Sequence, residues 1–184
     1  MFRFLLSPVL AIILFSSCTM ILSTNYPGSS EKSLPKEWLG KYEVITTSPF
    51  PEKKDSAQPG KEYAIIESTR ITWKTSDGDK IYSLNDSLRY SVMYGQSRYL
   101  SLLMPQGLYA VFKVIKKADT LELYSMSSDD EPKKAELNKY FGKVEKIKKG
   151  EDEYFKVTII EKKLNAYFKS PIPSKEPTRL VPVK

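Results

Sequence analysis

Histidine is absent from this chain of 184 residues, and cysteine occurs only once, as Cys18. The sequence therefore lacks the commonest transition-metal ligand and the side chain that most often moves protons near neutral pH. A single cysteine also excludes a disulfide within the chain. An enzyme of this composition would have to rely on paired carboxylates, an activated lysine or a bound cofactor. No set of residues specifies such a reaction, so we expect a protein without catalytic activity, cofactor or metal.

An apolar segment precedes the only cysteine. Arg3 is the single charged residue in this region, and the residues from Phe4 to Phe15 are mostly apolar. Two serines then separate this stretch from Cys18. A positive charge, a short apolar stretch and small residues are the parts of a secretory signal. We therefore expect residues 1–17 to be a signal peptide that exports the chain.

The position of Cys18 directly after this segment resembles the signal of bacterial lipoproteins. In that family the cysteine thiol is diacylated and the peptide is cleaved before it. The resemblance implies that Cys18 is the lipidation site, labelled by palmitate, and that the protein is anchored to a membrane of the cell envelope, facing the periplasm or the surface. Phe15 stands where the family usually has Leu, Val or Ile. Because residues 20–22 extend the apolar run to about nineteen residues, an uncleaved membrane anchor remains an alternative, as does free secretion.

Basic side chains are concentrated in the C-terminal third of the chain. Residues 131–184 carry 14 basic and 8 acidic side chains, whereas residues 18–130 carry 14 of each. An exported protein meets little nucleic acid, so the basic excess favours anionic lipid, an anionic glycan or an envelope protein as partner. The alternative is that these lysines only keep the protein soluble.

The middle of the chain consists of short runs rich in Tyr, Ile, Val and Leu, separated by turn-forming residues. Asp77-Gly78 and Pro105-Gln106-Gly107 are two of these turn sequences. Short runs that recur about every ten residues predict antiparallel strands that follow one another as a meander. The eight expected strands cover residues 39–46, 62–67, 69–75, 79–84, 87–94, 98–104, 108–116 and 119–126.

Two similar segments follow the strands. Residues 137–141 and 164–168 both read Leu-Asn-x-Tyr-Phe, with apolar residues at helical spacing. We expect two short amphipathic helices, near residues 131–141 and 159–169, that converge on these apolar anchors. The residues between them predict a β-hairpin at 144–157.

Composition also sets the expected domain borders. Residues 18–36 are rich in Ser, Asn, Pro and Gly and predict a flexible tether. Residues 37–170 then form a single β-rich domain. The last segment, 171–184, contains four prolines and predicts an extended Pro-rich tail.

Residues 38–44 read Trp-Leu-Gly-Lys-Tyr-Glu-Val and resemble the first-strand motif of the calycins, the family of lipocalins and fatty-acid-binding proteins. Gly40 matches the glycine of the motif, Trp38 takes the upstream aromatic position, and Tyr42 replaces the tryptophan. In lipocalins this motif closes one end of an eight-stranded barrel. The resemblance implies a mainly β fold with a lipocalin-like up-and-down barrel. The second helix and the hairpin depart from the family, so a curved antiparallel sheet with two short C-terminal helices remains the alternative.

In such a barrel one face of the strands lines an interior that holds one small ligand. The resemblance implies that the long first loop, residues 47–61, covers the open mouth, with Phe50 as a lid residue. The alternative is that the inward aromatic side chains only fill the core. The candidate ligand-lining residues are Tyr63, Trp73, Tyr90, Tyr94, Leu100, Leu102 and Phe112.

Ser56 is a candidate O-glycosylation site in the same loop. Asp55-Ser56-Ala57 resembles the Asp-Ser/Thr-apolar acceptor that some bacteria glycosylate in the envelope.

These features together favour a non-catalytic lipoprotein of the cell envelope that binds a small hydrophobic or amphiphilic ligand. The alternative is an envelope scaffold or assembly protein that contacts a partner through its basic C-terminal third. In both interpretations the membrane is reached through the lipid anchor on Cys18.

Overall fold

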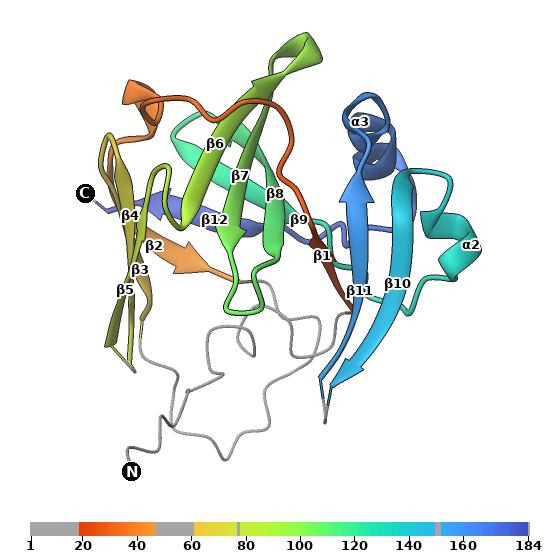
Figure 1. Ribbon diagram of the computed structural model, residues 1–184. Helices are drawn as coiled ribbons and strands as arrows, with labels where there is room; N and C mark the ends of the chain where they lie inside the picture. The colour runs from red at the N-terminus through yellow and green to blue at the C-terminus, as the bar shows by residue number, and fades with distance from the viewer. Residues whose placement is uncertain (1–18, 47–60, 77, 150–151, 184) are drawn as a thin grey trace.

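The computed structural model describes residues 19–46, 61–76, 78–149 and 152–183. Within these residues the protein is mainly β: twelve strands form one open, mixed sheet, and two short α-helices lie in the C-terminal third. Figure 1 shows a strongly curved part of the sheet beside a smaller layer that carries both helices. The mainly β fold and the two C-terminal helices confirm the prediction from the sequence.

The eight predicted strands are all present, with bounds close to the predicted ones. Several of the turns between them use a left-handed backbone, as at Asn85 with a φ of 66° and Ala118 with a φ of 50°. Apart from β5 and β6, each strand pairs antiparallel with the next. The strands are β2 (Gly40–Ile45), β3 (Tyr63–Ile66), β4 (Arg70–Thr75), β5 (Gly78–Ser83), β6 (Leu88–Met93), β7 (Ser97–Leu103), β8 (Tyr109–Lys117) and β9 (Thr120–Ser125).

The sheet does not close into a barrel, and the break lies between β5 and β6. The Leu84 amide at the end of β5 donates to the carbonyl of Thr69, whereas the Leu103 amide of β7 donates to the carbonyl of Ser87. Leu84 and Leu88 meet only in an isolated bridge. The structure describes β5 and β6 in full, and no ladder joins them. The reason is that the backbone groups near their ends form hydrogen bonds to other segments. The expected closed barrel is therefore wrong, and the strands form a curved, open sheet.

The C-terminal segment is part of the sheet rather than a tail. β12 (Thr178–Pro182) lies between β9 and β2 and pairs antiparallel with both. Leu180 opposes Leu121 on one side and Val44 on the other, and it is only 2% exposed. Pro177 stands just before the strand, where a missing amide is tolerated. The predicted extended Pro-rich tail at 171–184 is thus extended at residues 178–182 but is not a tail, because these residues pair with β9 and β2 within the sheet.

A buried carboxylate ties β12 to β9. The Glu122 side chain of β9 is 7% exposed and lies 2.8 Å from Nζ of Lys117 and 3.7 Å from Nε of Arg179 in β12. The Tyr124 hydroxyl donates a further hydrogen bond to it, at 2.8 Å. Burial acts to raise the pKa of Glu122, but the hydrogen bonds from Lys117 and Tyr124 outweigh it and hold the pKa below its ordinary value. Glu122 is therefore ionised in the folded protein.

The region expected to be a flexible tether, residues 18–36, is ordered from Thr19 onward. Thr19 and Ser128 exchange two backbone hydrogen bonds, of 2.7 and 3.0 Å. β1 (Met20–Ser23) then pairs in parallel with β11 (Asp152–Ile159). The tether prediction is wrong because Ile21 and Leu22 of β1 are only 2% and 1% exposed and pack in the hydrophobic interior.

From β1 the chain crosses the end of the curved sheet drawn at the top of Figure 1 and reaches the 3-10 helix η1 (Lys36–Trp38). The Leu34 amide donates to the carbonyl of Ser68 on the way. Leu34 and Trp38 are both buried, so this crossing covers the upper end of the sheet with apolar side chains. Trp38 in η1 and Tyr42 in β2, the aromatic residues of the motif at 38–44, are 0% and 5% exposed.

The remaining layer contains the predicted hairpin and both helices. β10 (Phe141–Lys149) pairs antiparallel with β11, and the helices are α2 (Lys134–Leu137) and α3 (Glu161–Lys169). α2 is shorter than predicted, because Phe141 already begins β10. The two similar segments still converge: Leu137, Phe141, Leu164 and Tyr167 belong to one buried cluster.

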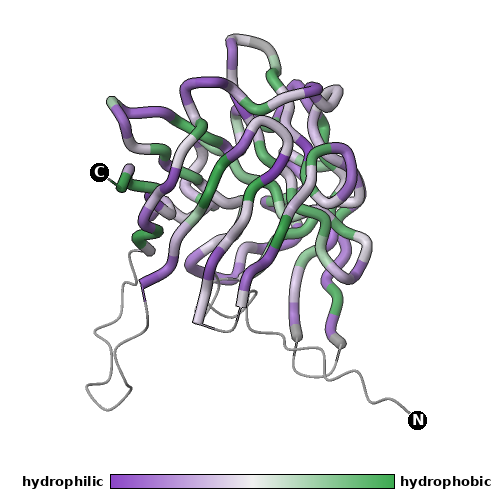
Figure 2. Tube along the Cα trace, turned by 90° about the vertical axis from the view of Figure 1, so that its left-hand side faces the viewer, coloured by the Kyte–Doolittle hydropathy of each residue, from purple (hydrophilic) through white to green (hydrophobic). Residues whose placement is uncertain are grey.

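Two hydrophobic cores lie on opposite faces of β7 and β8. The concave core lies inside the curved sheet and includes Leu100 and Phe112, and the outer core lies under α3 and the hairpin and includes Tyr99 and Val111. Figure 2 shows the hydrophobic and hydrophilic residues alternating along the strands. Since β7 and β8 have apolar residues on both faces, they connect the two cores.

Leu180→Ala tests whether β12 is integral to the sheet. The substitution removes a buried side chain at the centre of the ladder, so we expect a loss of about 2–5 kcal/mol in unfolding free energy, measured by urea denaturation. The matched control is Val183→Ala, at a side chain that is 41% exposed, where we expect a change within about 0.5 kcal/mol. A Leu180→Ala variant as stable as the control would show that the segment is dispensable.

Glu122→Gln tests the buried carboxylate. The folded-state pKa of Glu122 is lowered, so its contribution is complete above the unfolded-state pKa of about 4.3 and is lost as the pH falls through the folded value. At pH 7 we expect the variant to lose about 1.5–3 kcal/mol, the range for hydrogen bonds to a charged group. The difference from wild type should shrink below pH 4.

The control for this measurement is Glu145→Gln. Glu145 also pairs with lysines, Lys143 and Lys156, but its side chain is 32% exposed. Solvent screens such pairs, so we expect a much smaller loss. A Glu122→Gln variant that loses no more than Glu145→Gln, or a difference that does not change with pH, would contradict the proposed role.

Candidate functional site

The concave core is the candidate site because it gathers aromatic side chains from elements that are far apart in the sequence. Side chains alternate along a strand, so every second residue of the curved sheet faces this core. Six aromatic residues, from η1, β2, β4, β6, β8 and β11, are at most 8% exposed. They are Trp38, Tyr42, Trp73, Tyr90, Phe112 and Tyr154.

Most of the predicted lining residues lie in this core. Trp73, Tyr90, Leu100 and Phe112 are buried members of it, and Leu102 packs against it. The alternation within the predicted strands therefore identified the inward face correctly for β4, β6, β7 and β8.

Tyr63 lies on the opposite face of the sheet. Ala64, the next residue of β3, belongs to the concave core. The Tyr63 ring instead lies 4.5 Å from Nζ of the exposed Lys41. The assignment of Tyr63 to the lining set was off by one position in the alternation. The side chain of Tyr94, and the whole of Phe50 and Ser56, lie outside the described part of the chain.

Trp38 occupies the upper end of the concave core. Its ring meets that of Tyr90 edge-on, with the ring centroids 5.2 Å apart. The guanidinium of Arg98 lies 5.6 Å from the centre of the Trp38 ring. The Tyr42 hydroxyl donates to the Trp38 carbonyl at 3.0 Å. Contacts on several sides therefore fix the position of this indole.

The indole N–H of Trp38 is a buried donor without a partner. Trp38 is 0% exposed, and no hydrogen-bond acceptor for its Nε1 is present among the described residues. A buried donor left in this state costs about 1–3 kcal/mol. Buried polar groups in native proteins are almost always satisfied, so this donor indicates where an oxygen acceptor would be favoured.

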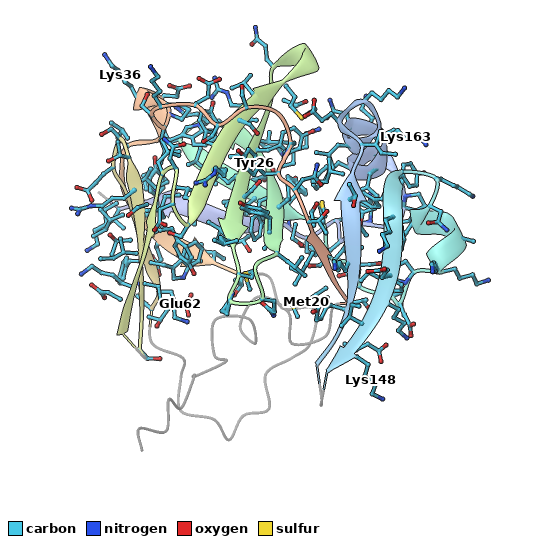
Figure 3. All side chains as sticks on the ribbon, viewed as in Figure 1. Met20, Tyr26, Lys36, Glu62, Lys148 and Lys163 are labelled. Carbon is cyan, nitrogen blue, oxygen red and sulfur yellow. The ribbon has the colours of Figure 1, made fainter. Side chains whose placement is uncertain are left out.

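The other tryptophan of the core shows the usual arrangement. Trp73 Nε1 donates to Oε2 of Glu62 at 3.0 Å. Glu62 is half-buried on the same face of β3 as Ala64, and Figure 3 shows it toward the lower end of the curved sheet. Sequence reasoning missed Glu62, although its spacing of two residues from an inward alanine would have placed it on this face. The two indoles thus differ in hydrogen bonding, and only that of Trp38 is unpaired.

The concave core carries little charge at neutral pH. Burial raises the pKa of the Tyr82 and Tyr90 phenols, so both are neutral. At the upper edge Arg98 pairs with Glu37 at 2.8 Å. A backbone hydrogen bond, and then Arg98, lower the pKa of Glu37. The arrangement suits binding through apolar contact and a few hydrogen bonds, rather than proton transfer.

A second polar cluster joins α3 to the outer face of β7 and β8. Oδ1 of Asn165 accepts hydrogen bonds from Tyr99 at 2.8 Å, from Ser97 at 2.9 Å and from Lys113 at 3.3 Å. Burial raises the pKa of Tyr99 to about 12, and burial followed by the charge of Lys169 lowers the pKa of Lys113. Because all three donors converge on one amide oxygen, the cluster positions α3. Sequence reasoning missed it because Asn165 reads as a surface residue of a helix.

Much of the basic charge of the C-terminal third is unpaired. Lys143, Lys146 and Lys156 pair with carboxylates. Eight other lysines have no carboxylate within ion-pair distance among the residues that the structure describes: Lys133, Lys134, Lys139, Lys148, Lys162, Lys163, Lys169 and Lys175. Most of these lie on and around the two helices, so this surface attracts anions.

Other candidate chemistry is not supported by the described residues. Nowhere in residues 19–46, 61–76, 78–149 and 152–183 do three or more His, Cys, Asp or Glu side chains gather as a metal site would require. In the same ranges no helix has the length and apolar character needed to cross a bilayer. Comparison with models of protein families, with curated proteins and with solved structures finds no match to this chain.

Proposed function

We propose that this protein is a non-catalytic lipoprotein of the cell envelope that binds a small amphiphilic ligand in the concave core. The observation that carries this proposal is the unpaired indole N–H of Trp38 within a core rich in aromatic rings. A ligand that brings an oxygen acceptor to Trp38 removes the cost of the unpaired donor. The same ligand gains by placing its hydrocarbon part among apolar side chains.

The charge near Trp38 narrows the class of ligand. The guanidinium of Arg98 lies beside the Trp38 ring, and Glu37 neutralises only one side of it. A carboxylate or phosphate oxygen therefore fits this end of the core better than an ammonium group. A fatty acid or a similar anionic amphiphile combines both requirements.

The remaining parts of the proposal rest on the sequence. The residues ahead of Thr19 resemble a lipoprotein signal, which favours acylation of Cys18 and location in the envelope. The motif at Trp38–Tyr42 and the strand order of β2–β9 favour a lipocalin-like sheet that is open between β5 and β6. In this proposal the break allows the two edges to separate when ligand enters.

The second candidate function is that of an envelope scaffold. The observation in its favour is the set of unpaired lysines on and around α2 and α3. In that function the lysine-rich surface contacts an acidic protein or an anionic glycan, and the concave core is filled only by its own side chains. Saturable binding of a fatty-acid probe separates the two functions.

Trp38→Phe tests the ligand-binding proposal. The substitution keeps an aromatic ring and removes the N–H donor, so we expect the wild type to bind an environment-sensitive fatty-acid probe at micromolar concentration and the variant to bind it more weakly. Loss of one hydrogen bond of about 1 kcal/mol corresponds to about a five-fold rise in Kd. Fluorescence titration measures this change.

The matched control is Tyr99→Phe, which removes a polar atom from a ring that is 0% exposed on the outer side of β7. Its partner is Asn165 rather than any residue of the concave core, so we expect unchanged probe affinity. Absence of saturable binding to the wild type would refute the proposal. Equal affinities for the wild type and Trp38→Phe would show that the Trp38 N–H does not bind the ligand, which would contradict the proposal.

Cys18→Ser tests the anchor. If the Cys18 thiol carries the acyl chains, the wild type should incorporate radiolabelled palmitate and fractionate with membranes. The variant should incorporate none and should either accumulate as uncleaved precursor or appear in the soluble fraction. Equal labelling of both proteins would contradict the lipoprotein assignment.

A further inference from the structure

The ordered domain begins at one end of the molecule, which we call the lower end. Thr19 is held by its two hydrogen bonds to Ser128, and β1 continues directly from it. Figure 3 shows Met20, Glu62 and Lys148 toward this end, and Lys36 and Lys163 toward the opposite, upper end. Only one peptide bond separates Cys18 from Thr19, and consecutive Cα atoms are about 3.8 Å apart. An acyl anchor on Cys18 therefore leaves no tether between the membrane and the folded domain.

The same end carries the turn between β7 and β8 and exposed apolar side chains near it. Residues 104–108 connect β7 to β8, and Figure 1 shows this turn at the lower end, on the same side as the start of β1. Leu103 beside the turn is 36% exposed, and Pro105 is exposed. Ile45, where β2 ends, is 44% exposed. Exposed apolar side chains beside an anchor gain by contact with the boundary between headgroups and acyl chains.

Two carboxylates near the lower end are paired with lysines, whereas Glu62 accepts the Trp73 indole N–H. Glu43 of β2 pairs with Lys61 at 2.9 Å, and Asp79 of β5 pairs with Lys74 at 3.1 Å. Lys148, near the tip of the β10–β11 hairpin, is exposed and has no carboxylate partner among the described residues. Anionic headgroups attract such a lysine, whereas the paired carboxylates contribute little repulsion.

From these observations we infer that the lower end lies directly against the lipid headgroups, with the β7–β8 turn and Lys148 in contact with the bilayer. This inference rests on the acylation of Cys18 in the proposed function. The inference gives the domain a fixed orientation on the membrane. The lower end of the curved sheet contacts the headgroups, and η1 and α3 lie on the side away from the bilayer. A domain of this size is roughly 40 Å across, so the upper end lies far from the headgroups.

The test uses the full-length, acylated protein in vesicles of phosphatidylethanolamine and phosphatidylglycerol. Cys18 is the only native cysteine, so a cysteine introduced elsewhere is the only free thiol of the acylated protein. We would place a thiol-reactive fluorophore at Gln106→Cys in the turn and at Lys148→Cys, with Lys36→Cys in η1 as the control. Quenching by a lipid with a spin label on its headgroup then reports which end contacts the bilayer.

We expect the labels at positions 106 and 148 to lose most of their emission and to shift to the blue, and the label at position 36 to keep its emission. Equal quenching at all three positions, or quenching only at position 36, would overturn the orientation. Flotation with the vesicles is measured on the same samples. Protein that floats without quenching at the lower end refutes this inference alone, whereas protein that does not float refutes the lipid anchor as well.

Discussion

The curved sheet depends on the two ladders made by β12. Without this strand, β9 and β2 would each expose an unpaired edge, and the concave core would lose its wall on that side. Leu180 fills the centre of the inserted strand, and Glu122 joins Arg179 across the β9–β12 pair. Because β12 comes from the last residues of the chain and β2 from the first third, the sheet becomes continuous only when distant segments meet. Pairing over such sequence separation is entropically demanding and slow.

β7 and β8 have a second role, because each is buried on both faces. Leu100 and Phe112 belong to the concave core, whereas Tyr99 and Val111 belong to the outer core. The hairpin and helices of the C-terminal third thus pack on the back of the same strands that form the proposed ligand site. Asn165 strengthens this connection by accepting three hydrogen bonds from β7 and β8.

The two features that suggest function lie at opposite ends of the molecule. Trp38 lies at the upper end of the concave core, and Thr19 marks the point where the proposed anchor meets the domain at the lower end. Binding and anchoring therefore involve separate residues and can be altered independently. Burial raises the pKa of the Tyr82 and Tyr90 phenols, so the concave core presents neutral hydroxyl groups at physiological pH.

Alternation and turn chemistry are local properties, so the amino-acid sequence was sufficient to predict the strands of the meander, the hairpin at 144–157 and the inward face of β4, β6, β7 and β8. The insertion of β12 into the sheet, the burial of β1 and the missing ladder between β5 and β6 became visible only in the folded structure. Each of these depends on which distant backbone groups satisfy one another, which no local pattern encodes. The unpaired N–H of Trp38 could not be predicted from the sequence either, because the lack of an acceptor depends on the positions of all the residues around the indole.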